Sequence, residues 1–440
     1  MPARPETLRT AIAGGAARLF GRHHAVSLAA MGRVLDADLT GAHVLLRTRD
    51  QLFAALALIE LDGIAARIVI APPDVKAEHL PSVIERAAID VVVGEDPALA
   101  VESVRFEQVH LRGEGPVILP SCKTEWVLFT SGTTGVPKMV AHGLQGLSGA
   151  IQPAASHGIV WGTFYDIRRY GGLQILLRAQ LGRAPLILSD ADESVADFLS
   201  RLGSHGVTHL TGTPSHWRRA LMSPANAAIA PRYVRLSGEI ADQAILGGLK
   251  TRFPDAAIGH AYASTEAGVG FEVTDGLEGF PASFINRPGP VEMKVADGTL
   301  HIRSPRTASQ YGGGGELRND GWVDTGDMVE LRGQRYFFAG RTGGIINVGG
   351  LKINPEEVEA VINRHPGVAL SRVSGRKNPI TGAIVIAEVV LADAANDNAS
   401  FRQAILDACR DKLPAFKVPA MLRFVPALEL TAGGKLSRHA

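Results

Sequence analysis

A loop rich in small hydroxylated residues lies between an apolar stretch and a proline–lysine pair. Residues 128–138 read Leu-Phe-Thr-Ser-Gly-Thr-Thr-Gly-Val-Pro-Lys and combine four hydroxyls, two glycines and a lysine. Small residues let backbone N–H groups approach a polyphosphate, and Lys138 adds positive charge. The Walker-type loop needs glycine before the lysine and Ser or Thr after it, whereas Pro137 and Met139 flank Lys138. A polar surface loop is the alternative. We predict that ATP phosphates bind at Thr130, Ser131, Gly132, Thr133, Thr134, Gly135 and Lys138.

An aromatic ring, a hydroxyl and a carboxylate occur together at 262–266, after a predicted strand at 257–258. Tyr262 could stack on a base, Thr265 could contact a phosphate and Glu266 could hold Mg²⁺. A carboxylate combined with phosphate oxygens is the usual hard-oxygen environment of Mg²⁺ in proteins. The alternative is an ordinary helix start, because Thr-Glu is common there.

Three later segments each place one functional side chain among glycines. Asp327 ends the segment 321–327 and could accept hydrogen bonds from ribose hydroxyls, although an ordinary hairpin turn is the alternative. Arg341 follows Gly340, ahead of a second glycine-rich stretch at 347–355. Lys435 lies in the C-terminal segment 431–438, where it could swing onto an anion or remain solvated.

The elements that must position these residues alternate between strands and helices. We predict strands at 43–46, 67–70 and 89–93 with helices at 51–61 and 81–88, and the same alternation at 184–188, 195–202, 207–210 and 243–253. This order is typical of an α/β parallel sheet with helices on its faces. Short strands follow at 293–295, 299–302 and 334–338, and a glycine run at 312–315 predicts a surface loop. A helix at 355–363, a strand at 384–391 and a helix at 401–413 end the chain, so we predict domains at 1–341 and 342–440.

The net charge, the cysteines and the apolar runs of the sequence argue against several classes of protein. The 440 residues carry a net charge of +1, which provides no field for a polyanion, so we do not expect a nucleic-acid partner. The two cysteines, Cys122 and Cys409, lack metal-ligand spacing and suit a reducing compartment. We find no signal-type N-terminus and no apolar run long enough to span a membrane. We therefore expect a cytoplasmic protein and a homodimer.

In this order, the segments resemble those of the adenylate-forming superfamily, which comprises acyl-CoA synthetases, aryl-acid ligases, peptide-synthetase adenylation domains and beetle luciferases. The resemblance runs from Leu128 to the C-terminus. It implies that Tyr262 stacks on adenine, that Thr265 contacts the α-phosphate and that Glu266 binds Mg²⁺. Lys435 corresponds to the mobile lysine that contacts both the carboxylate and the α-phosphate.

The remaining family segments line the nucleotide and the acid. Ser237, Gly238 and Glu239 are similar to the segment beside the adenine and acyl pockets, and Asp327 and Arg341 to the ribose-binding pair. The resemblance implies a large N-terminal domain of parallel-sheet βα layers plus a small distorted barrel, and a smaller, mobile α+β C-terminal domain.

The implied reaction activates a carboxylic acid with ATP and Mg²⁺ as an acyl-adenylate, releases pyrophosphate and passes the acyl group to a thiol. Cationic groups would neutralise the crowded anions. CoA is the first choice of acceptor, and the phosphopantetheine of a carrier protein is the runner-up. The resemblance places Gly349, Gly350 and Lys352 on the thiol's path. A nucleotide-binding relative without ligase activity is the alternative class, and no residue specifically indicates luciferase-type oxidation.

Several positions depart from the family pattern. The hinge position, usually Asp or Lys, is Gly343, and the phosphate loop lies near the N-terminus, so the first lobe is shortened relative to typical members. The segment 161–173 is similar to an acyl-pocket motif, with Tyr165, Arg169 and Gly171 at its centre. Arg169 could bind a second carboxylate or hydroxyl on the substrate, or pair with Asp166 or another local acid, as buried arginines usually do.

Overall fold

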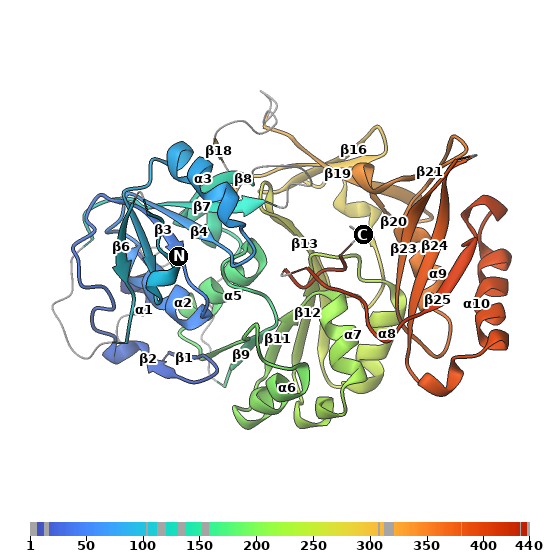
Figure 1. The fold of residues 1–440 in the computed structure, drawn as a ribbon, viewed down its shortest axis with the longest axis horizontal. Helices are drawn as coiled ribbons and strands as arrows, with labels where there is room; N and C mark the ends of the chain where they lie inside the picture. The colour runs from blue at the N-terminus through green and yellow to red at the C-terminus, as the bar shows by residue number, and fades with distance from the viewer. Residues whose placement is uncertain are drawn as a thin grey trace.

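The fold combines two large sheets, a smaller antiparallel sheet and a C-terminal domain (Figure 1). The computed structural model describes residues 7–12, 17–102, 104–111, 120–130, 137–151, 158–306, 309–311, 321–379, 381–431 and 433–437. Five residues of the predicted phosphate loop, Ser131 to Gly135, and the glycine run 312–315 lie outside these ranges.

The first sheet has seven strands, and the two strands that flank the phosphate loop, β7 (Glu125–Thr130) and β8 (Lys138–Gly143), are neighbours in it. In order, they are β18 (Ser309–Tyr311), β8 (Lys138–Gly143), β7 (Glu125–Thr130), β4 (Arg67–Ala71), β3 (His43–Arg47), β5 (Val91–Gly94) and β6 (Arg105–Gln108). The strands from β7 to β6 are parallel, and the apolar runs of β7, β4, β3 and β5 are buried on both faces. In contrast, β7 and β8 are antiparallel, and their last pair is Thr130 with Lys138.

The second sheet has eight strands, and it positions Tyr262 and the predicted segment 237–239. In order, they are β14 (Gly268–Val273), β13 (Ala257–Ser264), β12 (Tyr233–Ser237), β11 (His209–Gly212), β9 (Trp161–Thr163), β10 (Leu186–Leu188), β1 (Arg18–Phe20) and β2 (Ala25–Ser27). Its helices are α5 (Tyr170–Leu181), α6 (Val195–Ser204), α7 (Pro214–Met222) and α8 (Gln243–Arg252). The predicted strand at 257–258 extends to Ser264, so Tyr262 lies on a strand.

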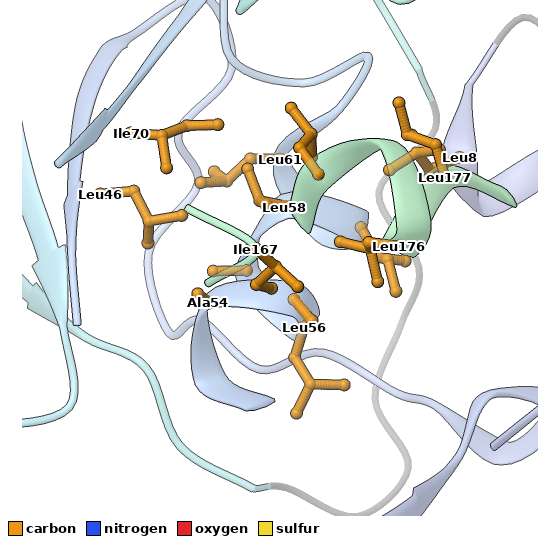
Figure 2. Close-up of a cluster of buried hydrophobic side chains, with 14 of the residues drawn as sticks. Leu8, Leu46, Ala54, Leu56, Leu58, Leu61, Ile70, Ile167, Leu176 and Leu177 are labelled. Carbon is orange, nitrogen blue, oxygen red and sulfur yellow. The ribbon is translucent and has the colours of Figure 1, made fainter. Parts of the chain in front are cut away.

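The largest core joins the two sheets. Helix α2 (Gln51–Leu61) is apolar on nearly every face, and ten of its eleven residues are buried. Figure 2 shows Leu56, Leu58 and Leu61 of α2 packed with Ile70 and Leu176. Asp50 caps this helix by accepting a hydrogen bond from the Leu52 N–H. A helix this hydrophobic must be covered on all sides, and the two sheets with α5 provide that cover.

Three short helices complete the N-terminal part: α1 (Leu8–Ile12), α3 (Leu80–Ala87) and α4 (Leu144–Ser148). The predicted small barrel is a five-stranded antiparallel sheet. In order, its strands are β15 (Phe280–Pro281), β20 (Arg335–Arg341), β19 (Val323–Arg332), β17 (Thr299–Arg303) and β16 (Glu292–Ala296).

The C-terminal part has its own core of strands and two helices, in which β21–β22 and β23–β24 pair antiparallel and β24–β25 pair parallel. It contains β21 (Ile346–Val348), β22 (Leu351–Ile353), α9 (Pro355–Asn363), β23 (Val368–Asn378), β24 (Gly382–Leu391), α10 (Ala399–Lys412) and β25 (Met421–Phe424). In Figure 1 the end of the chain returns from this part to the middle of the molecule. Within the described residues, no helix has the length and apolar character needed to cross a membrane.

Candidate active site

Strands from two sheets bring Tyr262, Asp327 and Arg341 together. The Tyr262 phenol on β13 donates a hydrogen bond to Asp327 Oδ2 on β19, at 2.5 Å. Arg341 ends β20, pairs in register with Asp327, and places its Nε 3.1 Å from Asp327 Oδ1. Its Nη2 also donates to the Thr325 carbonyl, at 2.8 Å. The structure therefore joins the predicted adenine and ribose residues in one network.

The Tyr262 ring belongs to a stack of aromatic side chains. Its centroid lies 5.5 Å from that of Phe271 and 5.4 Å from that of Phe338, with interplanar angles of 14° and 10°. Burial and the neighbouring Asp327 carboxylate raise the pKa of the phenol, so Tyr262 remains a neutral donor. The two phenylalanine rings and the hydrogen bond to Asp327 hold the Tyr262 ring in place.

Thr265 and Glu266 lie in the half-buried turn between β13 and β14. His142, on β8 of the other large sheet, contacts the Thr265 carbonyl through Nε2, at 2.9 Å. Burial lowers the pKa of His142 to about 4, so its ring is neutral near pH 7 and Nε2–H can donate to that carbonyl. His142 is therefore a buried, neutral histidine that joins the two large sheets through this contact.

The C-terminal loop brings Lys435 to the same region. A Cβ built at Gly238 would lie 3.2 Å from Lys435 Cε and 3.9 Å from Nζ. The Lys435 residue keeps contact with solvent, yet desolvation lowers the pKa of its ammonium, while the Glu239 carboxylate acts in the opposite direction. Arg341 and Arg169 also lower this pKa, and Asp327 raises it, so all four charged groups lie within electrostatic reach of Lys435.

The predicted segment 237–239 follows β12 and meets two other elements. Ser237 contacts the buried Tyr165 hydroxyl, with 2.8 Å between the two oxygens, and Tyr165 also donates to the Gly212 carbonyl at 2.6 Å. Glu239 accepts hydrogen bonds from the Ser215 N–H and hydroxyl and from the Leu436 N–H. This carboxylate therefore links α7 to the C-terminal loop.

The predicted pairing of Arg169 with an acid is correct, but Asp166 is the wrong partner. Asp166 binds the buried Arg168 through both carboxylate oxygens, at 2.7 and 3.0 Å. Arg169 forms an ion pair with Asp74, which lies shortly after β4 of the first sheet. Adjacent arginines on a turn point in different directions, and only Arg168 faces Asp166. Arg169 also lies beside the C-terminal loop, since a Cβ at Gly433 would be 3.6 Å from its Cδ.

A buried polar cluster beneath the site was missed by the sequence reasoning. Arg235 on β12 is 6% exposed, and its Nε lies 4.0 Å from Glu272 Oε1, which also accepts a 2.5 Å hydrogen bond from Tyr233. Arg178 on α5 is close enough to Arg235 that each opposes the other's charge, and its Nε is buried without a hydrogen-bond partner among the described residues. The spacing of Tyr170, Gln174 and Arg178 at every fourth helical position was the available signal.

The predicted thiol-path residues lie in the C-terminal part. Gly349 and Gly350 form the turn between β21 and β22, and Lys352 is exposed on β22. Gly350 borders an open groove that Asn347, Thr381 and other small residues also line.

Comparison with known proteins places this geometry in context. The AMP-binding enzyme family model matches residues 42–318, and the AMP-binding enzyme C-terminal domain model matches residues 357–435. A 2-succinylbenzoate–CoA ligase of Listeria innocua is 26% identical over 343 residues, covering 72% of this chain and 69% of that protein.

Two solved structures share the whole architecture. The o-succinylbenzoate CoA synthetase of Bacillus subtilis, in complex with the acyl-adenylate intermediate, has a TM-score of 0.76 at 19% identity, covering 98% of this chain and 97% of that one. An anthranilate CoA ligase in complex with anthranoyl-AMP also has a TM-score of 0.76, at 18% identity, covering 98% and 94%. At these identities the likeness confirms the predicted fold class.

Proposed function

We propose, from the premise that the chain belongs to the family of AMP-binding enzymes, that it joins an aromatic carboxylic acid to CoA through an acyl-adenylate. The family model covers more than half of the chain. The predicted class of AMP-forming acid–thiol ligase is confirmed by relatives of this activity, and ATP and CoA are its substrates.

The observation that carries the proposal is the position of Lys435. Its ammonium comes from the last segment of the chain, yet it lies beside Gly238 and within electrostatic reach of Asp327 and Arg341. An acid that attacks the α-phosphate brings two anions together, and a preorganised cation between them lowers that barrier. Tyr262, held by Asp327, would support adenine on one side, and Asp327 with Arg341 would bind the ribose.

The donor set beside this network suits Mg²⁺. Glu266 is a single half-buried carboxylate, and no group of three or more His, Cys, Asp or Glu side chains gathers elsewhere in the described residues. Mg²⁺ usually takes one or two protein carboxylates and completes its octahedron with phosphate oxygens and water. When bound, the ion would draw charge from the phosphates, while Glu266 and Thr265 orient them.

We propose that the substrate carries a second carboxyl group besides the one that is activated. Arg178 and Arg235 bring two positive charges beneath Tyr165 and Tyr170, and Glu272 balances only one of them. One substrate carboxylate would therefore neutralise this cluster. The names of the relatives agree, since 2-succinylbenzoate is an aromatic acid with two carboxyl groups.

The acceptor and the location complete the proposal. CoA is the acceptor, with its path along Gly349, Gly350 and Lys352 of the β21–β22 hairpin. The shortened first lobe, the mobility of the C-terminal domain, the boundary at 341–344, the cytoplasmic location and the homodimer stay predictions.

The test measures exchange of labelled pyrophosphate into ATP across matched acids. We expect exchange with benzoic acids that carry a second carboxyl group, and weaker exchange with the parent benzoic acids. Arg235→Met should remove this preference but retain exchange with the monocarboxylic acids. Equal exchange with the dicarboxylic and the monocarboxylic acids in the unaltered protein would contradict the proposed second carboxyl group of the substrate. No exchange with any carboxylic acid would contradict the ligase activity itself. A product formed only on a carrier protein, and not on CoA, would contradict the acceptor.

A further inference from the structure

We propose that Thr213, His216 and Glu239 form a seat for residues 434–436, and that this seat positions Lys435 for adenylation but not for transfer to the thiol. The inference rests on the proposed function, because it assigns Lys435 to the first half-reaction. Among the described residues, no hydrogen bond joins the Lys435 ammonium to a seat residue, although the Glu239 carboxylate lies within electrostatic reach of it. The hydrogen bonds of the seat hold the backbone on either side of Lys435.

Thr213 holds the residue before the lysine. Its hydroxyl is buried and donates a 2.6 Å hydrogen bond to the Gly434 carbonyl. The same oxygen accepts from the His216 N–H at 3.1 Å and caps α7. A rigid helix terminus therefore fixes the position of this hydroxyl, and the hydroxyl fixes the carbonyl that precedes Lys435.

His216 sets how closely the loop can approach. A Cβ built at Gly434 would lie 1.8 Å from His216 Cε1 and 2.1 Å from Nε2, so only glycine can occupy this position. Gly434 also has φ of +71°, which favours glycine independently. The ring is held by Thr213 and by a stacked contact with Phe164, at 5.5 Å between centroids. Burial lowers the pKa of His216 to about 3, so the ring adds no positive charge beside the lysine.

Glu239 holds the residue after the lysine. Its Oε1 accepts the Leu436 N–H at 2.8 Å, and two hydrogen bonds from Ser215 fix the carboxylate. The loop is thus attached at the Gly434 carbonyl and at the Leu436 N–H. Lys435, between these two points, is left to extend over Gly238.

The seat belongs to the large N-terminal part, whereas the loop belongs to the C-terminal end of the chain. If the loop leaves during thiol transfer, all three contacts break together, because they are concentrated on Gly434 and Leu436. A residue that merely stabilises the fold would affect both half-reactions alike. A seat residue affects adenylation alone.

The decisive experiment is a double-variant cycle. Gly434→Ala should lower pyrophosphate exchange by about a hundredfold or more, since each tenfold corresponds to about 1.4 kcal/mol of barrier. Adding His216→Ala to Gly434→Ala should raise exchange again by at least about tenfold, because it removes the clash between the new Cβ and the His216 ring. Recovery should be partial, because the strain of an alanine at positive φ remains. His216→Ala alone is the control. No recovery in the double variant would overturn the seat.

A matched pair at Thr213 tests the hydrogen bond. Thr213→Val should lower exchange by about tenfold, the size of one lost buried hydrogen bond, whereas Thr213→Ser should retain it. CoA-ester formation from the synthetic adenylate of the best acid in the panel should change by less than about twofold in both. Equal losses in the two half-reactions would show a structural role only and overturn the proposal.

A measurement that needs no substrate can test the seat independently of the proposed function. By hydrogen exchange of the intact protein, the peptide that contains Leu436 should exchange faster in Thr213→Val than in Thr213→Ser. If no acid supports ligation but this difference is present, the function fails and the seat stands. If ligation is found but exchange is the same in both variants, the seat fails.

Discussion

Tyr262 and Asp327 are 65 positions apart in the sequence and share a 2.5 Å hydrogen bond between Tyr262 Oη and Asp327 Oδ2. The bond crosses from β13 of the large sheet to β19 of the antiparallel sheet. Because Arg341 binds the other oxygen of the same carboxylate, Asp327 has a fixed orientation before any nucleotide enters. A preorganised carboxylate loses little entropy when a ribose binds to it.

Tyr262→Phe should therefore weaken ATP binding while the stacked ring remains. We expect the KM for ATP to rise by about tenfold, because a hydrogen bond to a charged group contributes about 1.5–3 kcal/mol. The maximal exchange rate should change little. Tyr262→Leu is the control that also removes the aromatic ring and should weaken ATP binding further. An unchanged KM in Tyr262→Phe would show that Arg341 alone orients Asp327.

The decrease in kcat/KM for pyrophosphate exchange at high pH should reflect deprotonation of Lys435. Desolvation lowers the pKa of its ammonium from the ordinary 10.5, so adenylation loses its cation at a lower pH than a solvated lysine would allow. We expect kcat/KM for exchange to fall as pH rises through this pKa, since kcat/KM reports the free enzyme. Lys435→Arg keeps its charge at every accessible pH and should lack this decrease, whatever its absolute rate. A decrease at high pH that persists in Lys435→Arg would assign it to another group.

His142 should make folding stability sensitive to acid. Its folded-state pKa, about 4, lies below the ordinary 6.5, so its contribution is complete above pH 6.5 and is lost as pH falls towards 4. The full loss is roughly 3 kcal/mol. His142→Gln offers an N–H to the Thr265 carbonyl but does not titrate. Urea unfolding at pH 7 and pH 4.5 should show a smaller decrease for His142→Gln, and parallel decreases would contradict the assignment.

An ion pair between the two parts of the chain should favour adenylation. Arg364, at the end of α9, binds Glu278 before β15 at 2.5 Å. Both side chains keep some solvent contact, so Arg364→Glu or Glu278→Arg alone should lower exchange by only about two- to fivefold. The double reversal should regain most of that loss at low salt. Thiol transfer should be unaffected in all three variants, and a loss there would place the pair in both half-reactions.

Sequence patterns predicted the elements well where the signal is local. The helix at 51–61 matches α2 because a capping aspartate precedes a run of good helix formers, and the helix at 355–363 matches α9 because Pro355 fits the first helical turn. Asn354 occupies the N-cap of α9, although its side chain forms no capping hydrogen bond. Most strand ends shifted by a residue or two, but the strands predicted at 257–258 and 334–338 extend to Ser264 and Arg341, since pairing with neighbours sets the ends.

The sequence could not predict which partners meet across the fold. Arg168 and Arg169 are equivalent in sequence, and only the turn before α5 decides that Arg168 faces Asp166. The cluster of Arg178 and Arg235 combines a helix with a strand 57 positions later, and His216 meets Gly434 from the far end of the chain. Such contacts depend on tertiary packing, which no local pattern encodes.

The antiparallel pairing of Thr130 with Lys138 has a consequence for how this protein attracts phosphate. Many nucleotide-binding loops lead into a helix, whose N-terminal dipole draws the anion in. Here the loop returns directly into strand β8, so no such dipole follows it. Under the proposed function, attraction would then come from separate charges, namely Lys138, the proposed Mg²⁺ and Lys435. Nucleotide capture should therefore weaken steeply as ionic strength rises, more than in proteins where a backbone dipole faces the phosphate.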